Sequence, residues 1–271
     1  MPCINHASAR CETMVVDLAA LARRMLADYD ARTPGRLFSE PLGLTTAQAY
    51  ALQAEIARLR EARGEKIIGY KVGCTSKPVR EQLGVKEPIF GRIFDTGCHG
   101  SGSVLSFRRY SHLAVEGELA VRLGTDLPAS SVSDEDYRAA IECVWPVIEL
   151  HDYVLRRGPA AGPELIALNG MHAGFVRAAE STSTRWPDSW QGLSVRIDGV
   201  VVGSDSESGA LGGPMQSLRW LAGRLAEFGL CLTAGHVILT GSPLPLYPVR
   251  PGNRITVEAP PLAKSFAEVG P

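Results

Sequence analysis

The stretch Ala114-Val-Glu-Gly-Glu-Leu-Ala-Val-Arg-Leu123 holds two glutamates, two residues apart, in a mainly apolar segment. Apolar residues fill one parity of the segment, whereas Glu116, Glu118, Ala120 and Arg122 fill the other. Successive side chains of a strand point to opposite faces, so this alternation predicts a β-strand with one buried face. The two glutamates then lie side by side on the other face, and the fold is expected to be organised around this strand.

Two carboxylates at this spacing have two interpretations. Like charges this close raise each other's pKa unless a cation lies between them. A hard divalent metal ion suits that position, because carboxylate oxygens are its preferred ligands. The alternative is a solvated strand face that carries two acids, and the segment by itself favours this alternative. The rest of the chain shifts the balance towards a metal site.

The composition limits the class of protein. The chain has 271 residues, of which 45% are hydrophobic and 21% charged, and its net charge is −1. A near-neutral charge gives no basis for binding nucleic acid or an anionic membrane, and no apolar run is long enough to cross a bilayer. Residues 1–14 lack an apolar signal core and are expected to be a disordered tail, with residues 15–271 forming a single domain. Six scattered cysteines indicate reduced thiols in a cytoplasmic protein.

The first third of the chain predicts helices followed by a strand. Apolar residues at helical spacing predict amphipathic helices from about Val15 to Tyr29 and from Thr45 or Thr46 to about Arg63. A strand is expected at 66–73, with Lys71 inside it, and then a short helix at 75–83.

The middle of the chain places a third acid in a strand. After a turn and strand at 87–93, a capping box at Ser133 predicts a helix from Asp134 to about Cys143. Residues 144–150 form the next predicted strand, and Pro146 predicts that it is an edge or irregular strand. Glu149 lies in this apolar run and needs a metal, an arginine or amide donors if it is buried.

The last third is mainly β. Asp198-Gly199 between apolar runs predicts a hairpin turn. Pro214 predicts a helix start, and strands are expected at 236–240 and 254–258. The buried stripe of that helix is expected to be Leu218, Leu221, Leu225 and Phe228. The pattern lacks the βαβ alternation of a Rossmann domain and predicts an α+β fold, mainly β, with the N-terminal helices packed against it.

Three further side chains are candidates for chemistry. Lys71 is flanked by glycines in an apolar strand, where it either reaches solvent along its stem or faces a cleft and stabilises negative charge. Asn169 and His172 are candidates for a catalytic role, although the residues themselves favour a structural role such as loop capping.

Several motifs, in the right order, resemble one family. Gly69-Tyr-Lys-Val-Gly-Cys-Thr-Ser-Lys77 resembles the GYKVGLTSK signature of the 2-keto-4-pentenoate hydratase and 4-oxalocrotonate decarboxylase family, within the fumarylacetoacetase superfamily. The resemblance runs from about Ala47 to Phe266. Its further motifs are Gln82–Gly91, Glu116-Gly-Glu118, Leu211-Gly-Gly-Pro214 (similar to LGHP), Leu239-Thr-Gly241 and Val249-Arg-Pro-Gly252.

The resemblance implies a fumarylacetoacetase-like fold with a bound Mg²⁺ or Mn²⁺ held by Glu116, Glu118 and Glu149. It implies a substrate that chelates the metal through a carboxylate and its C2 oxygen, with Lys71 as the catalytic residue at that oxygen. Ile89, Asn169, His172, Thr240 and Gly241 complete the expected substrate-binding set.

Two positions depart from the family pattern. Ile89 stands where the hydratases carry an aspartate and the decarboxylases an aliphatic residue, and this favours decarboxylation. Leu168 stands where the family commonly has an acidic residue.

The resulting functional prediction is a metal-dependent lyase of small 2-oxo or 2-hydroxydienoic acids. A 2-keto-4-pentenoate (2-hydroxypenta-2,4-dienoate) hydratase of aromatic-compound degradation is named first, and a 4-oxalocrotonate-type decarboxylase is the close alternative. A C–C bond hydrolase of the superfamily and a non-catalytic partner subunit are further alternatives. The expected partners are a small 2-oxo acid, other copies of the chain in a homo-oligomer, and a related lyase.

Overall fold

The structure is a computed structural model that describes residues 17–32, 42–127, 133–152, 154, 162–178, 192–205 and 213–271. The expected tail at 1–14 and Leu211-Gly212 of the LGHP-like motif lie outside these residues. None of the helices in the described ranges is long and apolar enough to cross a membrane.

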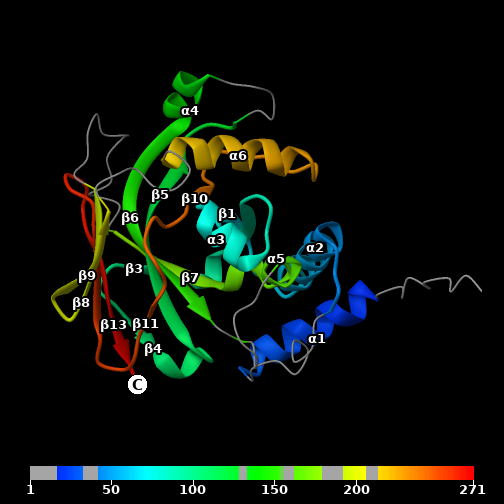
Figure 1. Cartoon of the computed structure of the whole chain (residues 1–271), viewed down its shortest axis with the longest axis horizontal. Coiled ribbons are helices and arrows are strands. Elements are labelled where there is room, and N and C mark those ends of the chain that lie inside the picture. The colour runs from blue at the N-terminus through cyan, green and yellow to red at the C-terminus, as the bar shows by residue number, and fades with distance from the viewer. Residues whose placement is uncertain are drawn as a thin grey trace, which may run out of the picture.

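An eight-stranded sheet forms the centre of the molecule, in the order β2-β1-β10-β5-β6-β7-β3, with β11 paired to β5 (Figure 1). The strands are β1 (Ile67–Gly73), β2 (Ile89–Phe94), β3 (Cys98–Gly100), β5 (Leu113–Leu123), β6 (Ile141–Asp152), β7 (His172–Arg177), β10 (Val237–Leu239) and β11 (Tyr247–Pro248). The antiparallel pair β5 and β6 is the longest in this sheet, with 11 and 12 residues.

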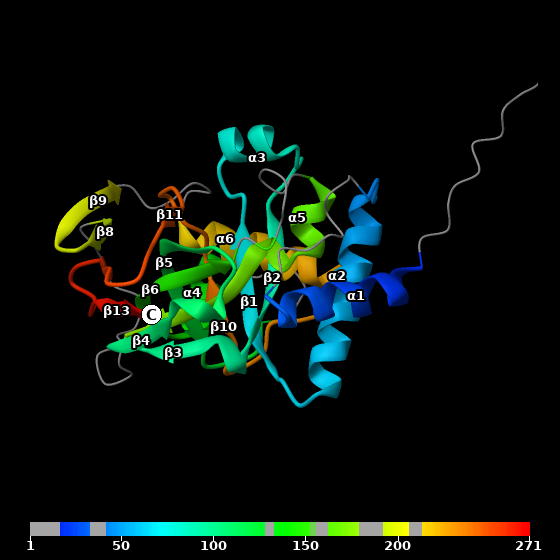
Figure 2. The same cartoon turned by 90° about the horizontal axis from the view of Figure 1, so that it is seen from below.

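A second sheet of five strands packs against the first, in the order β4-β13-β12-β8-β9. Its strands are β4 (Ser103–Ser106), β8 (Leu193–Ile197), β9 (Val200–Asp205), β12 (Arg254–Glu258) and β13 (Ser265–Gly270). Figures 1 and 2 both show this sheet on one side of the central sheet and the helices α1 and α2 on the other.

Gly117 lies where the two sheets meet. A Cβ atom at Gly117 would be 2.5 Å from Cγ2 of Val195 and 3.3 Å from Cγ1 of Val257, both in the second sheet. Real Cβ atoms do not approach other carbons this closely. The residue between the two glutamates must therefore be glycine for the sheets to pack as they do.

Six helices in the described part of the chain surround the sheets, and most of their starts follow signals in the sequence. They are α1 (Leu18–Asp30), α2 (Thr46–Ala62), α3 (Lys77–Leu83), α4 (Asp134–Ala140), α5 (Pro163–Ala167) and α6 (Pro214–Ala226), with 3₁₀ turns at Asp95–Gly97, Phe107–Arg109 and Asn169–Met171. Thr45 and Gln48 form a reciprocal capping box at the start of α2, which confirms that predicted boundary. The short helix α3 differs from the others in that none of its residues is buried.

Both faces of the central sheet are covered, so the expectation of one buried face on the Glu116 strand was wrong. We call the face that carries Glu116 and Glu118 the inner face. Cross-strand pairing and strand parity put a small core on it, with Ile93, Ala120, Trp145, Val147, Phe175 and Leu239 among its members. The opposite, outer face belongs to the main core, which the helices and the second sheet cover.

The central sheet rolls up until β2 approaches the segment before β7. The backbone N–H of Arg92 in β2 donates to Oδ1 of Asn169 at 2.6 Å, and Nδ2 of Asn169 donates to the Arg92 carbonyl at 2.8 Å. A Cβ atom at Gly91 would be 2.8 Å from the Asn169 carbonyl oxygen. The amide of Asn169 therefore closes the roll, as a neighbouring strand would.

Three expectations about element boundaries need correction. Helix α4 ends at Ala140, and β6 begins at Ile141, so the helix is three residues shorter than predicted. Phe228 lies beyond α6 and is 40% exposed, so it does not continue the helix's buried stripe. The strand that contains Pro146 is central and not an edge strand, because it pairs with both β5 and β7.

Pro146 is tolerated in a central strand because of its position along β7. Pairing with β7 begins only at Val147. The Pro146 carbonyl accepts a hydrogen bond from the Ser265 hydroxyl, and not from β5. The N and C=O of a strand residue point to the same side, so the missing N–H falls where β7 has already ended.

The remaining predicted elements are confirmed with small shifts at their ends. The Asp198-Gly199 hairpin joins β8 to β9, and both turn residues have positive φ, as such a turn requires. Gly84 ends α3 in the left-handed conformation.

Candidate active site

The pairing of β5 with β6 brings the predicted acids together on the inner face. Glu116 lies directly opposite Glu149 in the register of the two strands, and Glu118 lies opposite Val147. Side chains of directly opposed residues have Cβ atoms about 5 Å apart. The sheet therefore brings together Glu116 and Glu149, which are 33 residues apart in sequence.

Glu149 is the most deeply buried of these acids, with no solvent-exposed surface. Its Oε1 contacts Nζ of Lys71 at 2.8 Å and Nδ1 of His172 at 2.7 Å. Its Oε2 is buried and has no hydrogen-bond partner among the described residues. A buried charge needs partners, so one oxygen of Glu149 is satisfied by the protein and the other remains available to a ligand.

The charges of the cluster shift the pKa values in opposite directions. Burial raises the pKa of Glu149, but Lys71 and His151 lower it by more, so this carboxyl ionises well below its usual range. Burial and the neighbouring Glu149 raise the pKa of Glu118 well above its usual range. Burial lowers the pKa of Lys71, yet the carboxylates around it leave that pKa raised. Lys71 is therefore a permanent cation among several acids.

His151 is the site residue that the sequence interpretation missed. It is 4% exposed, and its Nε2 lies 3.3 Å from Oε2 of Glu116 and 3.3 Å from Oε2 of Glu149. Burial lowers the pKa of His151, but the two carboxylates raise it to about 9. The signal was present, because His151 is two residues after Glu149 and therefore shares its face of the strand.

Glu116, Glu149 and His151 form a group that could hold a metal ion, with ligand atoms within 4.8 Å of one another. Carboxylate oxygens and an imidazole nitrogen are suitable donors for a divalent cation. The unsatisfied Oε2 of Glu149 supports this fit. Glu118 lies in the same cavity but outside this group, and its Oε2 accepts the backbone N–H of Gly241 at 2.9 Å.

A cavity of about 350 Å³ opens in front of the cluster. Lys71, Glu116, Glu118 and His151 form its polar end, and Ile89 lines its wall, as expected. The remaining lining comes from α3 and the loop before it, from α5, from the turn before β7 and from the segment that follows β10. It includes Cys74, Thr75, Ser76, Val79, Leu165, Met171, Ser242 and Leu244. Its predominantly apolar character suits a small molecule with a polar group at the end formed by the cluster.

Two of the predicted substrate-binding positions, Thr240 and Gly241, do not line this cavity but directly precede Ser242, which does. The hydroxyl of Thr240 donates to the Leu119 carbonyl at 2.8 Å, and the residue is 4% exposed. Gly241 has a φ of +95°, and a Cβ atom there would collide with Thr75. The structure thus places Thr240 one residue beyond β10, bonded to β5, and gives Gly241 a backbone role next to Glu118.

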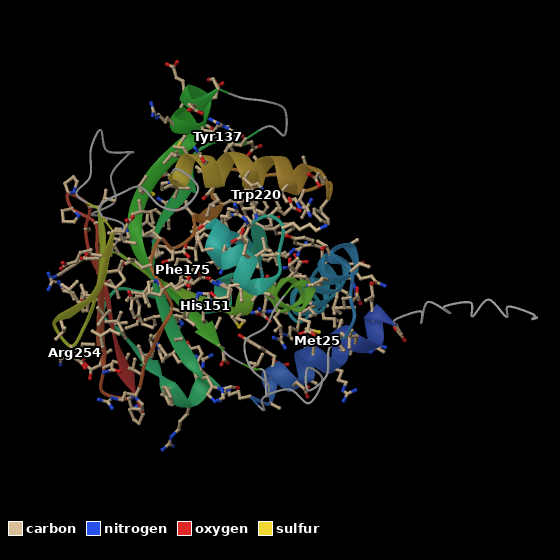
Figure 3. All side chains as sticks on the ribbon, in the orientation of Figure 1. Met25, Tyr137, His151, Phe175, Trp220 and Arg254 are labelled. Atoms are coloured by element: carbon tan, nitrogen blue, oxygen red, sulfur yellow. The ribbon has the colours of Figure 1, made fainter. Side chains whose placement is uncertain are left out.

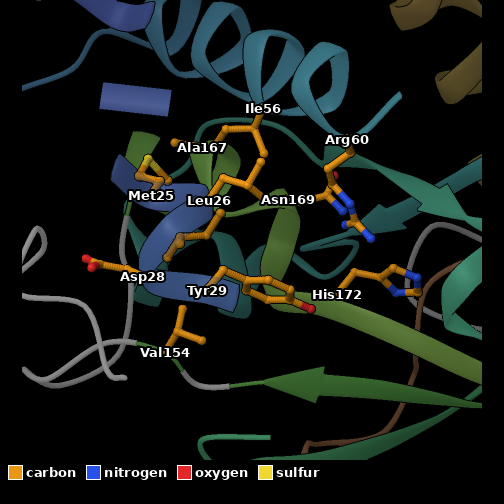
Figure 4. Close-up of a pocket in the computed structure, with 11 residues that line it drawn as sticks. Met25, Leu26, Asp28, Tyr29, Ile56, Arg60, Val154, Ala167, Asn169 and His172 are labelled. Carbon is orange, nitrogen blue, oxygen red and sulfur yellow. The ribbon is translucent and has the colours of Figure 1, made fainter. Parts of the chain in front are cut away.

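Asn169 and His172 lie behind the cluster and do not line the cavity in front of it. Asn169 closes the roll through Arg92, as described above. His172 and Asn169 line a second, smaller cavity of about 70 Å³ beneath α1 and α2, with Tyr29 (Figure 4). Burial lowers the pKa of His172, despite its contact with Glu149. Because Nδ1 of His172 contacts Oε1 of Glu149 and His172 lines only the second cavity, His172 orients Glu149 from the side away from the main cavity.

The side chains in Figure 3 show how these parts fit the whole molecule, with His151 and Phe175 in the middle of the rolled sheet. The model of the fumarylacetoacetate (FAA) hydrolase C-terminal family matches residues 68–269, a range that contains the central sheet and the cluster, and the chain belongs to this family.

The proteins that are similar to this chain in sequence include both hydratases and decarboxylases. A 2-hydroxyhexa-2,4-dienoate hydratase of Comamonas testosteroni is 34% identical over 227 residues, covering 83% of this chain and 86% of the relative. A 4-oxalocrotonate decarboxylase of Pseudomonas putida is 32% identical over 215 residues, covering 79% and 81%. The solved 4-oxalocrotonate decarboxylase from Pseudomonas putida G7, complexed with magnesium and adipate, superposes with a TM-score of 0.85 at 30% identity and covers 93% of this chain and 97% of that one.

Proposed function

We propose that this chain is a divalent-metal-dependent lyase of small 2-hydroxydienoic and 2-oxo acids, with hydration of a 2-hydroxypenta-2,4-dienoate-type substrate as its leading reaction. The observation that supports this most is the buried cluster of Glu149, Glu116 and Lys71 at the end of a small apolar cavity. Membership of the family and the hydratases among the relatives point to the same chemistry.

Each residue of the cluster has a role in this proposal. Glu116, Glu118 and Glu149 are the proposed metal ligands, and Mg²⁺ or Mn²⁺ is the proposed metal. A bound divalent cation would supply Lewis-acid polarisation of a chelated substrate oxygen. The ammonium of Lys71 stabilises negative charge on the C2 oxygen of the substrate. His172 holds Glu149 in place, and the apolar walls exclude bulk water.

Ile89 supports decarboxylation as the second candidate reaction. It is 2% exposed, and a Cβ atom at Gly170 would lie 3.7 Å from its Cδ1 and 3.4 Å from Nζ of Lys71. Ile89 therefore lies close to the ammonium group. It cannot accept a proton, and a dry wall disfavours a charged base that would activate water. Loss of CO₂ from a vinylogous 2-oxo acid mainly needs an electron sink, which the cluster supplies.

The test offers both substrates to the purified protein with Mg²⁺ or Mn²⁺. Hydration of 2-hydroxypenta-2,4-dienoate would add water across the terminal double bond and give 4-hydroxy-2-oxopentanoate. Decarboxylation of 2-oxohex-3-enedioate would release CO₂ and give 2-hydroxypenta-2,4-dienoate. The leading proposal expects the first reaction, and NMR of the products distinguishes the two. Decarboxylation without hydration would establish the second candidate, and turnover of neither would contradict the proposed function.

We further propose that the protein is a cytoplasmic homo-oligomer, and that it associates with a related lyase. The chain has six cysteines scattered through its length, which suits a reducing compartment. The edge strand β9 exposes Val200, Val201 and Val202, which are 38–65% accessible, and Phe266 of the same sheet is 48% accessible. Exposed apolar residues on a sheet edge suit contact with a second copy. Light scattering of the purified protein tests this, and a monomer at micromolar concentration would contradict it.

A further inference from the structure

His151 carries an inference about the kind of metal that the site prefers, and this inference rests on the proposed metal-dependent function. Its imidazole is buried on the inner face, lines the main cavity and points at the two carboxylates that face each other across β5 and β6. Neither ring nitrogen has a hydrogen-bond partner among the described residues. A buried polar side chain without a partner requires an explanation.

The distances around Nε2 of His151 distinguish between two explanations. A protonated imidazole bridging two carboxylates would form charge-assisted hydrogen bonds of about 2.7–2.9 Å. The separations from Glu116 and Glu149 are both 3.3 Å, and neither satisfies hydrogen-bond geometry. Adjacent donors on one octahedral divalent ion, with bonds of about 2.1 Å, lie roughly 3.0 Å apart. The observed spacing is nearer to that of neighbouring ligands on one metal ion.

The partners of Glu149 support the same explanation. Its Oε1 is occupied by Lys71 and His172, whereas its Oε2, the oxygen that faces His151, has no partner. Oε2 of Glu149 and Nε2 of His151, which both lack a hydrogen-bond partner among the described residues, therefore lie 3.3 Å apart beside Glu116. A cation bound between them would satisfy both.

We infer that Nε2 of His151 is a metal ligand, so that the site mixes nitrogen with carboxylate donors. Imidazole favours first-row transition metals over Mg²⁺, which prefers oxygen ligands. The site is therefore expected to select Mn²⁺, Fe²⁺ or Co²⁺ over Mg²⁺, by contrast with a site built from carboxylates only.

Pulsed EPR of the full-length protein loaded with Mn²⁺ tests the bond directly. Modulation from a directly bound ¹⁴N nucleus is expected in the wild type and should disappear in His151→Gln. The matched control is His172→Gln, which removes the other histidine that contacts Glu149. Its spectrum is recorded on the Mn²⁺ that remains bound, and this signal should keep the modulation. Competition between Mn²⁺ and Mg²⁺ should show the preference for Mn²⁺ falling at least tenfold in His151→Gln, which corresponds to about 1.4 kcal/mol.

Several results would overturn the inference. They are the absence of Mn²⁺ binding or of ¹⁴N modulation in the wild type, modulation that survives in His151→Gln, and modulation that is lost in His172→Gln. If His151→Gln does not fold, wild-type protein labelled with ¹⁵N-histidine decides, because the modulation changes only if a histidine nitrogen is bound. These readouts need no turnover, so a failure of the proposed lyase activity would be seen separately.

Discussion

Replacement of Gly117 by alanine probes the link between sheet packing and the metal-binding strand. The new Cβ would lie 2.5 Å from Cγ2 of Val195 and 3.3 Å from Cγ1 of Val257. Carbon atoms pack best at about 3.5–4.0 Å, so the first contact overlaps by about 1 Å. Overpacking of this kind typically costs about 1–3 kcal/mol. We expect Gly117→Ala to lower the free energy of unfolding by this amount.

Urea denaturation followed by circular dichroism measures the effect, with Gly223→Ala as the matched control. A Cβ at Gly223 in α6 meets nothing within 4 Å, so that change should stabilise the protein by about 0.5–1 kcal/mol. Adding Val195→Ala to Gly117→Ala removes the clashing methyl group. The double variant should be more stable than the sum of the two single changes predicts, by about 1 kcal/mol or more.

The single variant Gly117→Ala should also bind Mn²⁺ more weakly in calorimetry, because relief of the clash displaces the strand segment between Glu116 and Glu118. A stability within roughly 0.5 kcal/mol of the wild type, together with unchanged Mn²⁺ affinity, would refute the reasoning. It would show that the second sheet yields at this point without moving the strand.

Three further predictions follow from the site and from the surface around it. Lys71→Ala should lower turnover at least about a hundredfold, as loss of an oxyanion donor does. It should also destabilise the metal-free protein by about 3–5 kcal/mol, because it leaves Glu149 buried without its cation. Near-normal turnover in steady-state kinetics would remove Lys71 from the mechanism. Ile89→Asp should reduce any decarboxylation of 2-oxohex-3-enedioate at least about tenfold while hydration is retained or gained, as measured by NMR of the products, and unchanged decarboxylation would argue against a dry wall at this position. Burial raises the pKa of Glu65, but hydrogen bonds from Arg60 and neighbouring donors lower it to about 2. Glu65 therefore contributes stability that is fully present above its usual pKa of about 4.5 and is lost as the pH falls towards 2. Glu65→Gln should be less stable than the wild type at pH 6, by roughly 1–2 kcal/mol after allowance for solvent screening, and the difference should shrink towards pH 2; a difference independent of pH in urea titrations would contradict this.

The sequence was most informative where local chemistry decides the structure. Thr45 with Gln48, and Asp198 with Gly199, fix their own helix start and hairpin turn, and both signals are short in range. Pro146 misled the interpretation because a missing N–H is harmful only if a neighbouring strand needs it. Whether β7 extends past Pro146 depends on pairing with a segment more than 25 residues away, which no local pattern encodes.

In the candidate site too, local patterns predicted some features, whereas others depend on long-range packing. Strand parity put Glu116 and Glu118 on one face, and the same rule applied to β6 would have added His151 to Glu149. Parity cannot reveal that Asn169 closes the roll or that His172 lies behind the cluster, because both depend on how far the sheet curls. The curl is set by packing across the whole sheet, for example where Gly91 lets Asn169 approach β2.

Helix α3 has a kinetic consequence for the exchange of substrate and product. It contributes Val79, Gln82 and Leu83 to the cavity wall but buries none of its residues. The free energy needed to displace a segment depends on the apolar surface it buries, so α3 can open locally at little cost while the rolled sheet stays intact. Amide hydrogens of α3 should therefore exchange with solvent many times faster than those of β5 and β6. The cluster on β5 and β6 can therefore stay rigid while small molecules enter and leave the cavity past α3.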